Sequence, residues 1–194
     1  MSSHYIEISI MNIIQTKIQD LIIIEPKVFG DSRGFFYETF NVKRYQDVGI
    51  KAEFVQDNRS RSARNVLRGL HFQKTKPQGK LVTVTQGEVY DVAVDLRLDS
   101  ATFGQYEAVI LNGDNKLQFY IPPGFAHGFC VLSETADFQY KCTDYYDPSD
   151  EGGLLWNDPQ LNIEWPLSNP LLSAKDAELP CLADITKSLG KVGE

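Results

Sequence analysis

Residues 89–96 have the sequence Val-Tyr-Asp-Val-Ala-Val-Asp-Leu, in which polar and apolar side chains alternate. Successive side chains of an extended chain point to opposite sides, so Asp91 and Asp95 share one face. The apolar residues between and around them, such as Val92 and Val94, share the other face. This stretch therefore predicts a β-strand with two unlike faces.

The same two-residue period recurs along most of the chain. Turn-forming residues separate the repeats, for example Gly30-Asp31, Gln86-Gly87 and Gly113-Asp114. Further strands are predicted over residues 21–25, 35–40, 52–57, 67–73, 80–85, 104–111, 117–121 and 138–142. Many short strands at close spacing are typical of an all-β sandwich or barrel.

Few segments have the pattern of a helix. Asn41 can cap a short helix that continues to Gln46 and ends at Gly49, and a second short helix is expected over residues 171–177. From residue 147 onward Pro and Gly become frequent and the alternation fades, which predicts a wrapping C-terminal segment rather than a second domain. We expect the residues from Ala183 to the end to fray, because they have little to bury.

The chain's length and charge limit its class. Its 194 residues, 42% of them hydrophobic, suffice for one well-packed domain. A net charge of −7 argues against nucleic acid as the main partner, so an anionic ligand must meet local Arg and Lys. Three cysteines without a CxxC pair indicate a cytoplasmic protein. The chain has neither a stretch that resembles a signal peptide nor a run of about 20 apolar residues, so we expect no membrane partner.

Motifs of hydrolases and of nucleotide-binding proteins are either out of context or incomplete in this chain. Residues 30–34 match GxSxG, but the aromatic stretch 35–37 has strand chemistry where a nucleophile elbow needs a helix. The alternative is a hairpin turn at Gly30 and Gly34. No GxGxxG opens a helix, and Gly79-Lys80 lacks the rest of a P-loop, so no dinucleotide or ATP cofactor is predicted.

The histidines do not complete a metal-binding motif. The stretch 122–127 (PPGFAH) matches the second motif of metal-binding cupins, PxGxxH. The first motif fails, because the residues after His71 are Phe72, Gln73 and Lys74. A divalent ion prefers three or four protein ligands, and His71 with His127 supplies two. We therefore expect no metal.

The strand around His71 has an unusual polar stripe. Regular alternation over 67–73 places Gly69, His71 and Gln73 on one face, as expected for the inside of a ligand-binding barrel. A histidine hydrogen-bonded at a strand end is the structural alternative. Arg68 should point the other way, unless Gly69 marks a β-bulge.

Several long blocks give the chain a family resemblance. These are IIEPKVFGDSRGFFYETFN (22–41), FVQDNRSRSARNVLRGLHFQ (54–73), PQGKLVTVTQGEVYDVAVDLR (77–97), PPGFAHGF (122–129), FQYKCTDYYDP (138–148) and LSAKDAELP (172–180). From Met11 to about Ala183 the chain resembles the dTDP-4-dehydrorhamnose 3,5-epimerases, which are metal-free cupins. The resemblance implies a cupin-type jelly roll over 11–183, with 1–10 as an N-terminal extension and 184–194 as a tail.

The resemblance also implies roles for single residues. His71 corresponds to the base that removes a proton next to the sugar ketone, and Tyr140 to the proton donor on the opposite face. Lys80 corresponds to the residue near the carbonyl oxygen, and Asp176 to the carboxylate paired with the histidine. The chemistry agrees, because an ammonium stabilises an enolate oxygen and a histidine is largely neutral at pH 7. No role follows for Cys142.

Substrate-binding residues follow in the same way. The resemblance implies Arg33, Glu38, Gln56, Asn58, Arg68, His127, Glu151 and Lys175. Arginine and lysine suit a nucleotide diphosphate, and Tyr145, Phe35 and Phe36 are candidates to stack on a base or sugar. The resemblance further implies a homodimer in which Arg33 and Glu38 serve the neighbour's pocket.

The predicted function is therefore a cofactor-independent isomerase. It inverts carbons 3 and 5 of dTDP-4-dehydro-6-deoxy-D-glucose and gives dTDP-4-dehydro-L-rhamnose for polysaccharide synthesis. Three alternatives remain open: a single-carbon epimerase acting on a related dTDP-deoxysugar, a non-catalytic nucleotide-sugar-binding cupin, and a metal-dependent cupin oxygenase.

Overall fold

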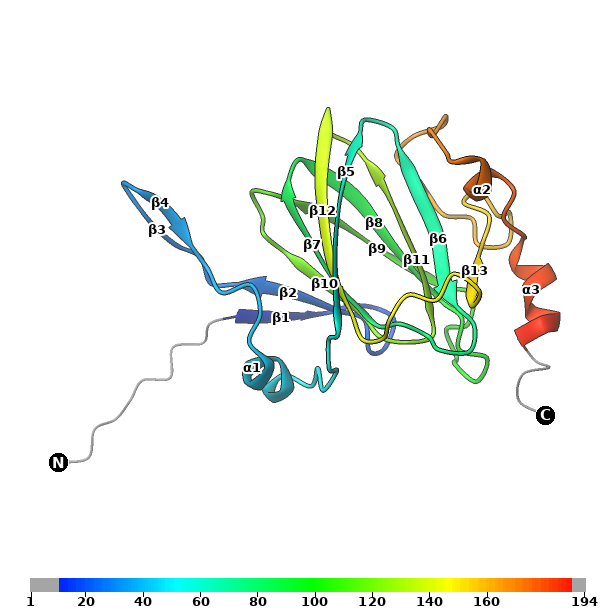
Figure 1. The fold of residues 1–194 in the computed structure, drawn as a ribbon, viewed down its shortest axis with the longest axis horizontal. Helices are drawn as coiled ribbons and strands as arrows, with labels where there is room; N and C mark the ends of the chain where they lie inside the picture. Colours follow the sequence, from blue (N-terminus) through cyan, green and yellow to red (C-terminus); the bar gives the residue numbers. More distant parts are fainter. Residues whose placement is uncertain (1–10, 190–194) are drawn as a thin grey trace.

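The computed structural model describes residues 11–189 and contains two sheets packed face to face (Figure 1). The six-stranded sheet has the order β1-β2-β10-β7-β12-β5, and the five-stranded sheet the order β13-β6-β11-β8-β9. The six strands are β1 (Met11–Gln15), β2 (Ile22–Pro26), β10 (Gln118–Ile121), β7 (Lys80–Gln86), β12 (Thr135–Cys142) and β5 (Gln56–Ala63). The five are β13 (Glu151–Gly153), β6 (Leu67–Gln73), β11 (Phe125–Val131), β8 (Glu88–Asp95) and β9 (Tyr106–Asn112). This arrangement confirms the all-β, cupin-type prediction.

A hydrophobic core fills the space between the sheets. Phe129 of β11 and Phe138 of β12 stack with ring centroids 3.9 Å apart, so one ring from each sheet meets at the centre. Both side chains are almost fully buried, and aromatic contacts of this kind add to the stability from buried apolar area. The core therefore fixes the spacing of the two sheets.

Strand β8 has two unlike faces, as its sequence predicts, but both are buried. Val92 and Val94 pack under the C-terminal segment, against residues such as Leu182. The opposite face points to the interior and buries Asp91 and Asp95 completely. Buried carboxylates require partners. Asp91 pairs with His127, and Asp95 pairs with Arg97.

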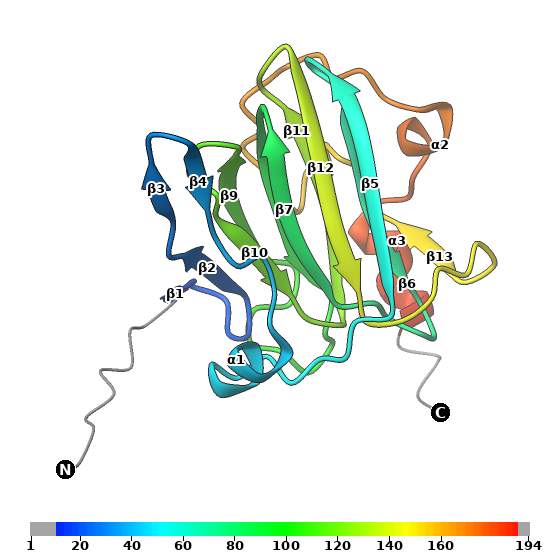
Figure 2. The ribbon, with the colours of Figure 1, turned by 60° about the vertical axis from the view of Figure 1, so that its left-hand side comes forward.

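The C-terminal segment wraps over the five-stranded sheet, as expected from its composition (Figure 2). Helix α2 (Ala174–Ala177) is shorter than the predicted 171–177 and starts after Ser173, whose hydroxyl accepts from the Asp176 amide. The expected fraying from Ala183 is wrong for helix α3 (Leu182–Leu189). Leu182 and Ile185 of this helix are buried in the core under β8. Residues 190–194 lie outside the described residues, as does the expected extension 1–10.

Near the N-terminus the hairpin prediction is confirmed. Strands β3 (Phe29–Asp31) and β4 (Gly34–Phe36) pair around the turn and project from the body of the fold (Figure 1). The predicted strand 35–40 is wrong beyond Phe36. Helix α1 (Val42–Asp47) follows with Asn41 as its N-cap, as predicted.

Other strands also differ from the prediction. The strand expected over 52–57 begins only at Gln56 and continues to Ala63. Strand β11 was not predicted, because both of its faces are buried and its residues do not alternate. Among the described helices, none is long and apolar enough to cross a membrane.

Candidate active site

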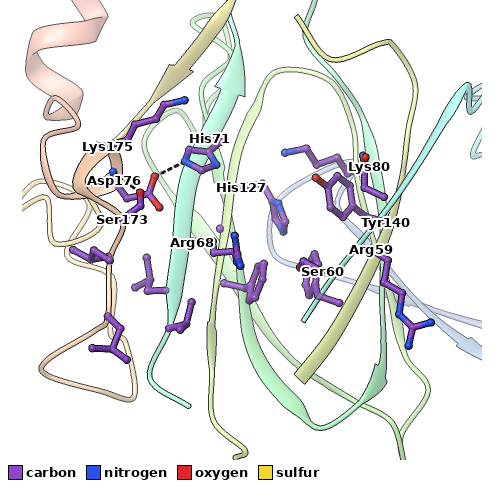
Figure 3. A pocket seen from close by; sticks show the side chains of 18 residues that line it. Arg59, Ser60, Arg68, His71, Lys80, His127, Tyr140, Ser173, Lys175 and Asp176 are labelled. Carbon is purple, nitrogen blue, oxygen red and sulfur yellow. Dashed lines mark hydrogen bonds and ion pairs between the residues drawn. The ribbon is translucent and has the colours of Figure 1, made fainter. Parts of the chain in front are cut away.

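A cavity of about 600 Å³ opens between the two sheets (Figure 3). The four predicted catalytic residues, His71, Lys80, Tyr140 and Asp176, all line it. Predicted binding residues line it too, namely Asn58, Arg68, His127 and Lys175. The structure therefore brings together residues that are spread over more than a hundred positions of sequence.

A β-bulge at Gly69 directs both Arg68 and His71 toward this cavity. His127 of β11 lies opposite His71, but Phe129 lies opposite Arg68, so the register shifts between them. Gly69 has a φ of +118°, and a Cβ there would lie 2.6 Å from the Gly128 Cα. Only glycine fits this conformation and this close approach. The bulge suggested by the sequence is confirmed.

His71 is held by a buried carboxylate. Its Nε2 lies 2.7 Å from the Asp176 Oδ1, and Asp176 is 4% exposed. Burial alone would raise the pKa of the Asp176 carboxyl. The hydrogen bonds with His71 and Ser173 have the larger, opposite effect and hold this pKa below its ordinary value. Asp176 therefore stays ionised at neutral pH and orients a partly exposed imidazole.

Tyr140 and Lys80 lie on the other side of the cavity, on neighbouring strands of the six-stranded sheet (Figure 3). The Lys80 Nζ lies 5.9 Å from the centroid of the Tyr140 ring. Burial raises the pKa of Tyr140, so its phenol keeps its proton, and burial lowers the pKa of Lys80. Within residues 11–189 the Lys80 ammonium has no carboxylate partner, which leaves its charge for a ligand.

His127 forms a second histidine–carboxylate pair beside the first. Its Nε2 lies 3.0 Å from the Asp91 Oδ2, and both side chains are buried. Burial lowers the pKa of His127, so the ring is neutral near pH 7. The PxGxxH stretch thus builds a cavity wall, and the described residues contain no group of three His, Cys, Asp or Glu side chains placed to hold a metal.

A smaller pocket adjoins the main one and shares His71, Lys80 and Tyr140 with it. Tyr146 and the predicted Glu151 line this pocket, and the Tyr146 hydroxyl donates to the Glu151 Oε2 at 2.6 Å. The same carboxylate forms an ion pair with Lys175, at 2.5 Å. Glu151 thus connects the loop before β13 to helix α2.

Gln56 lies at the edge of this arrangement rather than in either cavity. Its side chain donates to Asn58 Oδ1 and accepts from the Tyr146 backbone amide, at 3.2 and 2.9 Å. Asn58 in turn donates to the Cys142 sulfur at 3.6 Å, which gives this buried cysteine a contact with a cavity residue.

Besides Gln56, three predicted binding residues line neither the main cavity nor the smaller pocket. Arg33 is exposed at the tip of the projecting hairpin and pairs with Asp31. Glu38 pairs with Arg44 at 2.6 Å. Tyr145 is 66% exposed and lines neither the main cavity nor the smaller pocket, where its neighbour Tyr146 lies instead.

Asp91, Ser62 and Tyr146 contact or line the site but are not among the residues predicted from the sequence. Ser62 had a usable signal, because alternation along β5 places it on the same face as Asn58. Asp91 faces inward with Ala93 on β8, but nothing in the sequence distinguishes a buried aspartate from a solvated one. Tyr145 and Tyr146 are adjacent, and the choice between them depends on loop geometry.

Comparisons with known proteins identify the family of this chain. A family model described as dTDP-4-dehydrorhamnose 3,5-epimerase matches residues 15–184. The chain is 58% identical over 175 residues to the enzyme of that name from Salmonella typhimurium, covering 89% of this chain and 96% of that one.

A crystal structure of the epimerase RmlC from Legionella pneumophila, in complex with dTDP-4-keto-L-rhamnose, is 60% identical with a TM-score of 0.89, covering 92% of this chain and 96% of that one. ChmJ, a 3'-monoepimerase from Streptomyces bikiniensis in complex with dTDP-quinovose, is 31% identical with a TM-score of 0.84, covering 89% of both. The chain belongs to the dTDP-4-dehydrorhamnose 3,5-epimerase family.

Proposed function

We propose that the cavity epimerises carbons 3 and 5 of dTDP-4-dehydro-6-deoxy-D-glucose and gives dTDP-4-dehydro-L-rhamnose, in dTDP-rhamnose biosynthesis. The observation that carries this proposal is the placement of His71 and Tyr140 on opposite sides of one cavity (Figure 3). Inversion at a carbon next to a ketone requires a base on one face and an acid on the other. Membership of the epimerase family supports the overall reaction. The geometry of the cavity supports the roles of His71 and Tyr140.

In the first step His71 removes the proton next to the C4 ketone. Asp176, 2.7 Å away, holds the ring in place and stabilises the imidazolium that forms. The electrons of the C–H bond move to the ketone oxygen and form an enolate. Lys80 stabilises this oxygen, because its ammonium is partly buried and has no carboxylate partner within residues 11–189.

In the second step Tyr140 donates its proton to the same carbon from the opposite face. Burial keeps this phenol protonated, as a proton donor requires. The enolate collapses to the ketone, and the carbon has inverted. Exchange with solvent then removes the proton from His71 and returns one to Tyr140, and the same two transfers at the other carbon complete the reaction. Each step is a proton transfer, so this chemistry needs no cofactor.

The other polar residues in and beside the cavity bind the diphosphate and the sugar. Arg68 and Lys175 line the cavity and suit the diphosphate, since guanidinium and ammonium groups bind phosphate oxygens strongly. Asn58 and His127 line the same cavity and supply polar contacts to the sugar, with Gln56 and Glu151 adjoining.

We further propose a homodimer in which Arg33 and Glu38 complete the neighbour's cavity. The exposed hairpin that carries Arg33 supports this proposal, because Phe35 and Phe36 beside it are 63% and 70% exposed. Exposed apolar groups of this size mark interaction surfaces. Mixing inactive Arg33→Ala and His71→Ala variants should restore activity, since one cavity of each heterodimer is then intact, and no restoration would contradict the arrangement.

We also propose a cytoplasmic location. Cys130, Cys142 and Cys181 are unpaired, and free thiols suit a reducing compartment.

Isotope exchange tests the main proposal. Incubation with the substrate in D₂O should place deuterium at both C3 and C5 of the product, and His71→Ala should abolish this exchange while binding of dTDP is kept. Deuterium at one carbon would indicate a single-carbon epimerase. Identity favours two carbons, at 58% to the 3,5-epimerase and 31% to the 3'-monoepimerase. Unchanged turnover after His71→Ala would overturn the mechanism.

A further inference from the structure

Arg68 is joined to the opposite sheet by one hydrogen bond. Its Nε donates to the hydroxyl oxygen of Ser62 at 3.0 Å. Ser62 lies on β5 of the six-stranded sheet and is 6% exposed, whereas Arg68 lies on β6 of the five-stranded sheet. The contact therefore spans the two sheets beside the turn that connects these strands.

Arg68 also differs from most arginines of this chain in having no carboxylate partner. Five others form ion pairs with Asp or Glu, namely Arg33, Arg44, Arg59, Arg61 and Arg97. Within residues 11–189 no such pair involves Arg68. Arg59 contributes to the cavity wall too, but its guanidinium is held by Asp137 and points away from the cavity (Figure 3).

A hydroxyl partner has a different effect from a carboxylate. It fixes the rotation of the guanidinium through Nε but leaves the positive charge uncompensated. It also leaves the two terminal nitrogens, Nη1 and Nη2, free to bind two phosphate oxygens side by side. An arginine that is already oriented loses less side-chain freedom when the ligand binds.

We propose that Ser62 is a positioning residue that presents Arg68 to the diphosphate of the substrate. This inference rests on the proposed role of Arg68 in binding the nucleotide. Ser62 does not touch the reacting carbons, so its effect belongs in substrate affinity and KM rather than in kcat.

A double-mutant cycle tests the inference, with dTDP as the probe in calorimetric titrations. Ser62→Ala should weaken dTDP binding and raise KM by about three- to tenfold, with kcat within about twofold. Arg68→Ala should weaken binding by tenfold or more, because a charge-assisted contact is lost. Adding Ser62→Ala to Arg68→Ala should cause no further loss, because Ser62 acts only through Arg68.

Ser60→Ala is the matched control. Ser60 lies two residues earlier on the same face of β5 and lines the cavity, but it has no hydrogen bond to Arg68. Its own effect should simply add to that of Arg68→Ala. Arg68→Lys gives a second test that leaves Ser62 in place. Lysine keeps the charge but lacks both the Nε–H and the paired terminal nitrogens, so this variant should lose more affinity than Ser62→Ala, and adding Ser62→Ala to it should cause no further loss.

These variants distinguish the binding role of Arg68 from the positioning role of Ser62. If Arg68→Ala leaves dTDP affinity unchanged, the proposed binding role of Arg68 is wrong. If Arg68→Ala weakens binding but Ser62→Ala does not, the binding role stands and the inference about Ser62 is overturned. An equal loss from Ser62→Ala with and without Arg68 would overturn it as well.

Discussion

His71 on β6 and Tyr140 on β12 belong to different sheets and face each other across one cavity. The side chains that pack between the sheets, with Phe129 and Phe138 in contact at the centre, set the space between base and acid. A planar enolate held in this space is open to one residue on each face. Inversion thus depends on the packing of the sandwich as much as on the two side chains.

Replacing Tyr140 with Phe should separate proton removal from inversion. His71 would still remove the proton and return one from its own face, so deuterium from D₂O enters the substrate without a change of configuration. Product formation should fall by about 10²–10⁴-fold, the usual contribution of a positioned acid. NMR of the reaction in D₂O measures both rates. Tyr120→Phe, at a buried tyrosine outside the cavity, is the control, and a wild-type product rate in Tyr140→Phe would refute the assignment.

Tyr146 should matter more for nucleotide binding than Tyr145. Tyr146 lines the smaller pocket and is held by Glu151, whereas Tyr145 lines neither cavity. Stacking of an aromatic ring on a base is worth about 1–3 kcal/mol, so Tyr146→Ala should raise KM by roughly tenfold. Tyr145→Ala should change KM by less than about twofold. Steady-state kinetics of the two variants decide between them, and a larger effect at Tyr145 would restore the original assignment.

Gly69→Ala should destabilise the fold and inactivate the site together. A Cβ would lie 2.6 Å from the Gly128 Cα and 2.8 Å from the His127 carbonyl oxygen, at a φ of +118°. We expect a loss of about 2–4 kcal/mol in the free energy of unfolding, from strain and overpacking. Gly34→Ala is the control, because Gly34 has a φ of +128° with nothing within 4 Å of a Cβ. Urea unfolding should show a clearly smaller loss there, and equal losses would argue against a role for the close approach.

Asp95→Asn should remove part of the chain's stability in a pH-dependent way. Burial raises the pKa of this carboxyl, but hydrogen bonds from Arg97, Ser100 and Thr102 lower it more, to about 2. A pKa below the unfolded value of 3.8 stabilises the fold above pH 4, and this contribution is lost as the pH falls through 2. The shift corresponds to roughly 2 kcal/mol at neutral pH. Denaturation of both proteins between pH 7 and pH 2 should show their difference shrinking, while the exposed Asp99→Asn should match the wild type throughout.

Alternation predicted the strands that carry the site, because a side chain pointing inward recurs at every second residue. It identified β6 and β12 and the polar stripe that contains His71, whereas Tyr140 was assigned to the site by the family resemblance. It failed at β11, whose two faces are both buried, and at α3, whose two buried anchors are too few to give a pattern. These errors have one cause, since the sequence does not reveal which surfaces another segment covers.

The site itself was predictable in part. Residues carried by regular strands, such as Lys80, were placed correctly at the cavity. Arg68 faces the cavity because of the β-bulge at Gly69. The glycine indicated this bulge, whereas regular alternation would place Arg68 on the other face of the strand. The choice between Tyr145 and Tyr146 depended on loop conformation, which no local pattern encodes. Alternation places Ser62 on the same face as Asn58, but its contact with Arg68 spans the two sheets and has no local signal.

The hydrogen bond between His71 and Asp176 joins residues 105 positions apart, and Asp176 comes from the segment that wraps around the finished sandwich. During synthesis on a ribosome, the base is therefore made long before its carboxylate. A nascent chain can close both sheets while its imidazole is still unsupported, so the base gains its carboxylate only when the wrapping segment docks.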